Sequence, residues 1–196
     1  MIMSMCNVIC VTNRRLSGAR FLEQVERAAS AGVSAVILRE KDLPEAEYEG
    51  LARQVKKICE DRQVPLILHT YMDAALRLGI HRIHLPIQAF LNMNDQQRKR
   101  FDTLGVSTHS VEEAVSAWKG GASYVTAGHI FTTDCKKGVP PRGLSFLEEV
   151  CHSVDIPVYA IGGVNQENRR SCLEAGAAGV CLMSAFMKVG IPGLFF

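Results

Sequence analysis

The chain has 196 residues, of which 47% are hydrophobic, so it can bury one substantial core but is short for two ordinary domains. We therefore predict a single domain over residues 1–196. Lys and Arg number 22 against 20 Asp and Glu, and a net charge of +2 excludes a general attraction to nucleic acid or to an anionic membrane.

The seven cysteines are scattered, with no C-x-x-C pair and no spacing typical of a metal site. This arrangement is typical of cysteines that stay reduced in a cytoplasm. The apolar N-terminal stretch lacks the leading positive charges and cleavage site of a signal peptide, and no apolar run reaches membrane-spanning length. We expect a cytoplasmic protein with no metal, no cofactor, and no nucleic-acid or membrane partner.

Short β-rich apolar runs recur along the chain, and each is followed by a helical pattern. The predicted strands are Asn7–Thr12, Ala35–Arg39, Pro65–His69, Arg82–Leu85, Thr103–Ser107, Tyr124–Ala127, Val158–Ile161 and Gly179–Met183. Repeated βα units indicate a parallel sheet, and eight strands favour a closed (β/α)₈ TIM barrel over an open doubly wound sheet.

Helical spacing of apolar residues lies between these strands. The predicted helices are Ala19–Ala31, Glu45–Arg62, Met72–Leu78, Asn94–Phe101, Val111–Trp118, Ser145–Val154 and Asn165–Ala175. After the eighth strand, Gly190, Pro192 and Gly193 oppose a helix, so we expect a shortened or missing final helix. A missing final helix would leave a groove between the first and seventh helices. Either the terminal 194–196 segment or the partner in a homodimer would cover this groove.

In a (β/α)₈ enzyme the working side chains follow the carboxyl ends of the strands. The candidates at these positions are Arg39 and Lys41, His69, Ser107, the segment after Gly128, Gly162 and Gly163, and Met183 and Ser184. Two glycines before a helix bring backbone amides close to a phosphate, and the loops after strands seven and eight often hold one. A simple packing turn explains the same glycines.

The segment from Gly128 to Gly143 is the most informative, because an unstructured connection of that length is usually functional. It contains His129, Thr133, Asp134 and Lys136. A histidine changes charge near neutral pH, which suits a group that gives and takes protons. A Cys135–His129 nucleophilic pair can also be written, but no third orienting group is apparent.

Three motifs carry a family resemblance: Leu38-Arg39-Glu40-Lys41, Gly128–Gly138 and Ala160–Gly163. Together they resemble the thiamine-phosphate synthase superfamily of (β/α)₈ proteins, over essentially the whole chain. The Gly128–Gly138 motif and His81–Pro86 are more similar to its TenI branch, whose members are thiazole tautomerases. The resemblance implies that His129 is the proton donor that aromatises a carboxythiazole phosphate, supplied by the thiazole synthase as an ylidene tautomer.

Departures from the synthase pattern separate the alternatives. In synthases, acidic residues after strands three and four hold Mg²⁺ for a pyrophosphate, whereas the matching positions here are Thr70 and Ala89. Arg39, Lys41 and Lys136 do match synthase phosphate-binding positions. Synthase activity is therefore the alternative reading, and a non-catalytic regulatory TenI-like protein is another. His69 stands where both groups are expected to have asparagine.

For the tautomerase reading, the phosphate is assigned to Gly162, Gly163 and Ser184, with Met183 beside them. The ring and its carboxylate are assigned to Arg39, Ser107 and the Thr133–Lys136 segment, because a guanidinium fork matches two carboxylate oxygens. An alternative interpretation is that Thr133 and Asp134 only fix the shape of the loop. His84 is expected to be a packed, hydrogen-bonded residue of its strand.

Overall fold

The fold is a closed barrel of eight parallel strands in chain order, seen in a computed structural model that describes residues 7–136 and 138–188. The strands are β1 (Val8–Val11), β2 (Ala35–Leu38), β3 (Leu66–His69), β4 (Arg82–Pro86), β5 (Thr103–Thr108), β6 (Tyr124–Gly128), β7 (Val158–Ile161) and β8 (Gly179–Leu182). The predicted fold class is confirmed, and each strand end lies within one residue of its predicted position.

Most strands are buried at every residue, as the patterns of β1, β2, β3, β6 and β8 show. Both faces of a parallel strand in this fold are covered, which is why the strands are almost uninterrupted apolar runs. The parallel registers pair Ile9 with Ala35, Val36 with Leu66, Ser107 with Thr126, and Gly128 with Ile161. These registers set which strand-end residues are neighbours.

The helices follow the predicted order with several shifted boundaries. They are α1 (Arg14–Ser17), α2 (Phe21–Ser30), α3 (Glu45–Asp61), α4 (Met72–Arg77), α5 (Ile87–Leu91), α6 (Asp95–Arg98), α7 (Val111–Lys119), α8 (Gly143–Ser153), α9 (Arg169–Glu174) and α10 (Ser184–Met187). A 3₁₀ helix, Gly18–Arg20, joins α1 to α2. The final helix is short, as predicted, in the part of the chain described up to Lys188. The glycines and proline invoked for it lie outside the described residues.

Two predicted helices were shorter than expected, and one helix was missed. The helix predicted over Asn94–Phe101 is α-helical only over Asp95–Arg98, although Asn94 caps it with a reciprocal bond to Gln97. Helix α9 begins at Arg169 rather than Asn165, because the Asn165 side chain accepts backbone hydrogen bonds in a turn there. Helix α5 was not predicted, and it follows β4 directly after Pro86.

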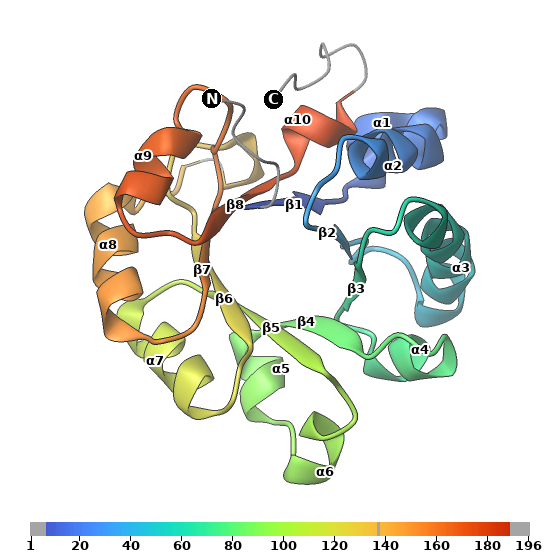
Figure 1. Ribbon diagram of the computed structural model, residues 1–196, viewed down its shortest axis with the longest axis horizontal. Coiled ribbons are helices and arrows are strands. Elements are labelled where there is room, and N and C mark those ends of the chain that lie inside the picture. The colour runs from blue at the N-terminus through green and yellow to red at the C-terminus, as the bar shows by residue number, and fades with distance from the viewer. Residues whose placement is uncertain (1–6, 137, 189–196) are drawn as a thin grey trace. The chain divides into compact units, whose positions relative to one another are not determined.

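Contacts divide the chain into two compact units. One unit runs to Ile83 and resumes at Leu182; within it, α2 packs against α3, and α10 packs against α2. The other unit spans His84–Cys181; within it, α7 packs against α8, and both contact β6 (Figure 1). The residues singled out in the sequence fall into both units.

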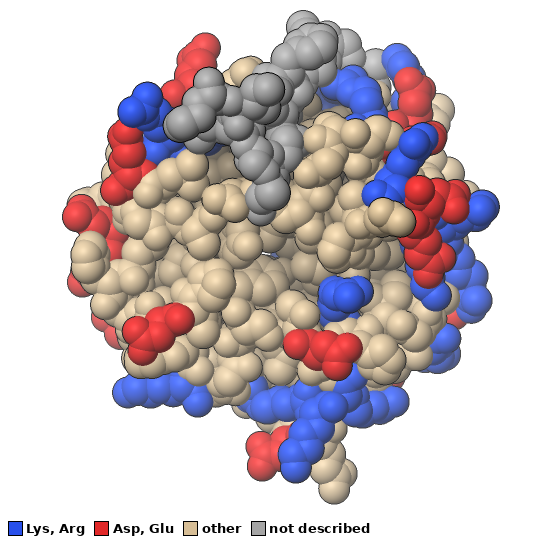
Figure 2. All heavy atoms as spheres, viewed as in Figure 1, with Lys and Arg blue, Asp and Glu red and all other residues tan. Residues whose placement is uncertain are grey.

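Charged side chains of opposite sign lie next to one another on the face drawn in Figure 2. In the first unit, Arg62 pairs with Glu26 at 2.8 Å, and Arg77 joins Glu45 and Glu49 at 2.6 and 2.8 Å. Exposed pairs of this kind contribute about 0–1 kcal/mol each. None of the described helices combines the length and the apolar character that crossing a membrane requires.

Candidate functional site

His129 follows β6 directly and is only 5% exposed. Its Nε2 lies 3.2 Å from the carbonyl oxygen of Val139, further along the same loop. Its Nδ1 is buried, and the described residues give it no hydrogen-bond partner. A carbonyl oxygen can only accept, so this contact places a proton on Nε2 and, in a neutral ring, leaves a lone pair on Nδ1. The ring therefore has one committed and one unused nitrogen.

The glycine turn after β7 packs directly against the loop that carries His129. Gly162 and Gly163 have φ values of 93° and 68°. A Cβ at Gly162 would overlap the Cβ of His129, and one at Gly163 would stand 2.7 Å from the Phe131 carbonyl oxygen. The Phe131 amide also donates to the Gly162 carbonyl at 2.9 Å. Of the two readings of these glycines, this geometry supports the packing turn directly, and phosphate binding stays a prediction.

The rest of the long loop contains a 3₁₀ helix, Asp134–Lys136, so the segment is not wholly irregular. Thr133 is half-buried, whereas Asp134 and Lys136 are exposed. Burial lowers the pKa of His109, and the nearby charge of Lys136 lowers it further. The placement of Lys136 near the start of α7 follows from that interaction. The side chain of Cys135 lies outside the described part of the chain, so the alternative of a Cys135–His129 pair is not taken further.

A chain of hydrogen bonds joins three strands of the second unit. His84 on β4 is 3% exposed, and its Nδ1 lies 3.0 Å from the Tyr124 hydroxyl on β6. Its Nε2 lies 2.8 Å from the Ser107 hydroxyl near the end of β5. Ser107 itself is half-buried. The prediction that His84 is a packed, hydrogen-bonded residue is confirmed, and one of its partners is a predicted site residue.

Gly105 makes room for this chain. A Cβ there would overlap the ring and hydroxyl of Tyr124 and would stand 2.6 Å from His84 Nδ1. Tyr124 also packs edge-on against Tyr159, with ring centroids 5.6 Å apart. Burial raises the pKa of the Tyr124 hydroxyl well above its ordinary value, so the hydroxyl keeps its proton. The chain therefore includes a hydroxyl that stays neutral, and it depends on a small residue at position 105.

In the first unit, Glu40 is the centre of a network that holds the loop after β2. The residue is 3% exposed, and its carboxylate accepts from the Thr12 hydroxyl at 2.6 Å and from the Arg14 amide at 3.1 and 3.0 Å. Thr12 in turn accepts from the amide of Arg39 at 2.9 Å. Burial raises the pKa of Glu40, against the opposing effect of Thr12 and Arg14. The backbone of Arg39 is thereby tied to the end of β1.

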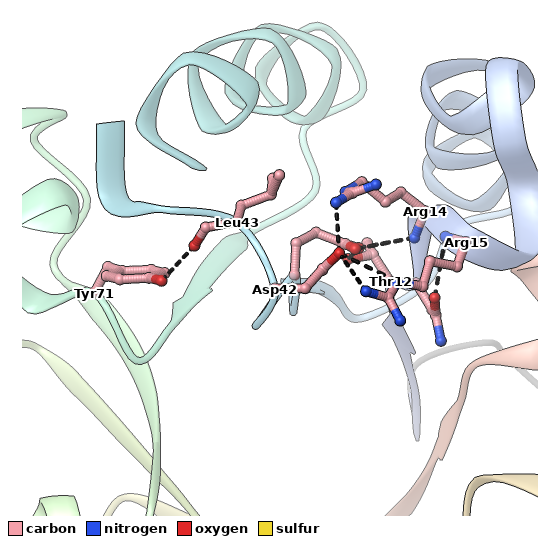
Figure 3. Close-up of polar contacts among 8 residues, drawn as sticks. Thr12, Arg14, Arg15, Asp42, Leu43 and Tyr71 are labelled. Carbon is pink, nitrogen blue, oxygen red and sulfur yellow. Dashed lines mark hydrogen bonds and ion pairs between the residues drawn. The ribbon is translucent and has the colours of Figure 1, made fainter. Parts of the chain in front are cut away.

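Next to this network, the Asp42 carboxylate forms ion pairs with two guanidinium groups. Arg14 and Arg15 approach its Oδ2 at 2.5 and 3.0 Å, as Figure 3 shows next to Thr12. Tyr71 donates to the carbonyl of Leu43 at 2.5 Å and fixes the far end of the same loop. Arg39 is half-buried and Lys41 is exposed. Within this unit, the arginine and lysine predicted to bind substrate stand on a loop that is anchored at both ends.

The other predicted residues of this unit occupy the ends of β3 and β8. His69 is 4% exposed; its amide donates to the Tyr48 hydroxyl at 2.9 Å, and its Nδ1 lies 2.5 Å from the Thr70 hydroxyl. Met183 caps α10 and is contacted through sulfur by the Asn13 amide nitrogen at 3.7 Å. Ser184, the first residue of α10, is exposed.

Sequence reasoning missed three residues that organise these groups: Glu40, Gly105 and Tyr124. A glycine inside a strand often marks a close approach, so Gly105 carried a readable signal. The sequence indicated Glu40 only as a member of the Leu38-Arg39-Glu40-Lys41 motif. Its carboxylate and the Tyr124 hydroxyl act on partners 28 and 40 residues away, which no local pattern reveals.

Known proteins resemble this chain along nearly its whole length. A thiamine-phosphate synthase 2 of Streptococcus pneumoniae is 37% identical over 91% of this chain and 86% of its own length. A thiamine-phosphate synthase of Clostridium novyi is 34% identical over 91% of this chain and 89% of its own length. The solved structure of a thiamine phosphate pyrophosphorylase from Pyrococcus furiosus superposes with a TM-score of 0.82 at 29% identity, covering 95% of this chain and 90% of that one.

The family model described as thiamine monophosphate synthase matches residues 8–186. The match runs from the first strand to the last helix, and it includes Ser107 on β5 and the loops that carry Glu40 and His129. The chain belongs to the thiamine monophosphate synthase family.

Proposed function

We propose that this chain is a thiazole tautomerase of thiamine biosynthesis, which aromatises a carboxythiazole phosphate by acid–base proton transfer at His129. The observation that carries the proposal is the buried imidazole after β6, with Nε2 on the Val139 carbonyl and Nδ1 without a partner among the described residues. A buried polar atom left unpaired costs about 1–3 kcal/mol, so its retention is more typical of a working group than of a packing residue.

The reaction breaks one C–H bond and forms another within the same molecule. A proton leaves the ring carbon that bears the carboxylate, its electron pair enters the ring, and the exocyclic carbon gains a proton. The lone pair on Nδ1 suits the first step, and the protonated imidazole suits the second. Because His129 is only 5% exposed, we infer that the surrounding loop moves to admit the substrate to Nδ1 before either step.

The substrate-binding assignments follow the two units. In the unit His84–Cys181, we assign the phosphate to the backbone of Gly162 and Gly163, and the ring carboxylate to Ser107 and the Thr133–Lys136 segment. In the other unit, Arg39, Lys41, His69, Met183 and Ser184 keep the binding roles predicted from the sequence. The anchoring of the Arg39 backbone by Thr12 supports a fixed position for its guanidinium stem.

The proposal is tested by following aromatisation of the ylidene tautomer through its ultraviolet absorbance. We expect His129→Ala to lose about 10²–10⁴ in kcat, the usual contribution of a general acid or base. Binding of the aromatic product, measured by calorimetry, should be largely kept. His152→Ala is the matched control, since that histidine is exposed and bonds only within α8. Equal rates in wild type and His129→Ala would remove His129 from the mechanism.

Thiamine-phosphate synthase activity is the second candidate, and the names of the relatives favour it. That reaction implies Mg²⁺ bound by hard oxygen ligands. The residues do not fit such an ion: Thr70 and Ala89 stand where carboxylates are expected, and among the described residues no three His, Cys, Asp or Glu side chains gather. We therefore derive no step through a metal.

The two candidates separate in one assay. The protein is mixed with the pyrimidine pyrophosphate, the thiazole phosphate and Mg²⁺, and thiamine phosphate is measured by fluorescence after oxidation. We expect no coupling above the uncatalysed rate. Coupling at an ordinary turnover of about 1 s⁻¹ or more would replace the tautomerase proposal with the synthase.

A further inference from the structure

In the hydrogen-bond chain from Tyr124 through His84 to Ser107, the donor and the acceptor of each bond can be assigned. We propose that Tyr124 and His84 are positioning residues that force the Ser107 hydroxyl to donate its proton to an anionic oxygen of the ligand. The inference rests on the proposed function, in which Ser107 contacts the substrate carboxylate. It adds two residues that no sequence motif suggested for that role, and it assigns the position of each proton.

The direction begins at the buried end. Tyr124 is 6% exposed, and in the described structure the hydrogen bond of its hydroxyl is the one to His84 Nδ1, at 3.0 Å. A hydroxyl has one proton to place, and accepting from Nδ1 would leave that proton buried without an acceptor. Donation to Nδ1 is therefore the arrangement that satisfies Tyr124.

The imidazole passes this direction on. A charged ring would be desolvated at 3% exposure, so the neutral ring with one N–H is favoured. Because Nδ1 accepts from Tyr124, the proton lies on Nε2 and points to the Ser107 oxygen, 2.8 Å away. Ser107 accepts that bond and keeps its own proton for another acceptor. An anionic oxygen gains most from such a donor, since charge-assisted hydrogen bonds are the stronger kind.

The same three residues superficially resemble a nucleophilic serine with a histidine base. In a hydrolase triad the third group is a carboxylate that accepts from Nδ1–H, which frees Nε2 to take the serine proton. Tyr124 does the reverse, because burial keeps its hydroxyl protonated and makes it the donor. Ser107 is therefore a binding group and not a nucleophile in this arrangement.

The tautomer of His84 can be measured directly by ¹⁵N NMR of the folded, unliganded protein. We expect an unprotonated Nδ1 and a protonated Nε2 in wild type, and a mixture of tautomers in Tyr124→Phe. Tyr159→Phe is the matched control, because it removes a hydroxyl from the neighbouring ring without touching the bond to His84. A wild-type ring protonated on Nδ1 or on both nitrogens would overturn the proposal.

The effect on the ligand is measured by a double-mutant cycle on aromatisation. We expect Ser107→Ala to raise KM about tenfold and Tyr124→Phe to raise it about threefold, each with kcat nearly unchanged, which are magnitudes typical of one hydrogen bond. The double variant should bind no worse than Ser107→Ala alone. Additive losses would show that Tyr124 acts independently of Ser107 and would overturn the positioning role.

Failure of this inference and failure of the proposed function give different results. Absent aromatisation, with the Nε2–H tautomer and non-additive losses in the calorimetric affinity for aromatic carboxythiazole phosphate, overturns the tautomerase and keeps the role of Tyr124. Normal aromatisation with an Nδ1–H tautomer does the opposite. Wild-type protein that does not bind this compound overturns Ser107 as its donor.

Discussion

Two polar networks, one in each compact unit, fix the ends of strands by different chemistry. Around Glu40 the acceptor is a carboxylate, and its donors are a hydroxyl and the backbone amide of Arg14. Around His84 the groups are neutral, and the chain works only with one placement of protons. The hydrogen bonds of the first network are strong, and they depend on pH because Glu40 carries the charge. The hydrogen bonds of the second network are weaker, and they depend on the space that Gly105 leaves beside Tyr124.

The largest effect should come from breaking the charged network. Glu40→Ala removes the acceptor of the buried Thr12 hydroxyl and of the part-buried Arg14 amide. We expect a loss of about 2–4 kcal/mol in the free energy of unfolding, measured by urea denaturation, since each orphaned group costs about 1–3 kcal/mol. Glu60→Ala is the control, because its carboxylate is 65% exposed, and its effect should stay within about 0.5 kcal/mol. Equal losses in the two variants would show that the network adds nothing.

Gly105→Ala tests the neutral network through shape. The new methyl group would overlap the ring of Tyr124, and the ring must move away from His84. We expect a loss of about 1–3 kcal/mol, as in other overpacked cores, measured in the same denaturation series.

Gly50→Ala is its counterpart, because Gly50 lies in α3 with open space around its Cβ position. That change should raise the free energy of unfolding by about 0.4–1 kcal/mol. A neutral or stabilising Gly105→Ala would mean that the space beside Tyr124 is not needed.

The smallest effect is a difference in pH dependence between wild type and Glu40→Gln. Burial raises the pKa of Glu40 above its ordinary value of 4.5, so the folded protein binds this proton more tightly than the unfolded chain. That stability is complete below the unfolded pKa and is lost as pH rises through the raised folded pKa. As pH rises from about 4.5 through the raised pKa of Glu40, the urea midpoint of wild type should therefore fall relative to that of Glu40→Gln. Parallel curves would contradict the assignment.

The sequence predicted the strands best, because burial on both faces leaves a continuous apolar signal, as in Ala35–Leu38. The bounds of Val158–Ile161 are the same in prediction and structure, although that strand is only partly buried at alternate residues. Short elements were harder. Helix α5 has only five residues and follows β4 without a polar turn, so its pattern merges with the strand. At Asn165 the predicted cap is a real turn, but the α-helix starts four residues later.

For the site, position was predictable and partnership was not. His129 and Arg39 were found because they directly follow strands, and Ser107 because it lies at the carboxyl end of one. What orients each of them comes from distant residues: the Val139 carbonyl, the His84 ring and the Thr12 hydroxyl. Such partners are set by strand register and by loop closure, which a one-dimensional pattern does not contain.

Gly162 packs so closely against the Cβ of His129 that the turn after β7 and the loop after β6 cannot move independently. A redesign that gives the β6 loop a new ligand must therefore treat Gly162 as fixed, whatever the ligand is. Conversely, a side chain introduced at Gly162 would push the His129 imidazole out of place even before a substrate binds.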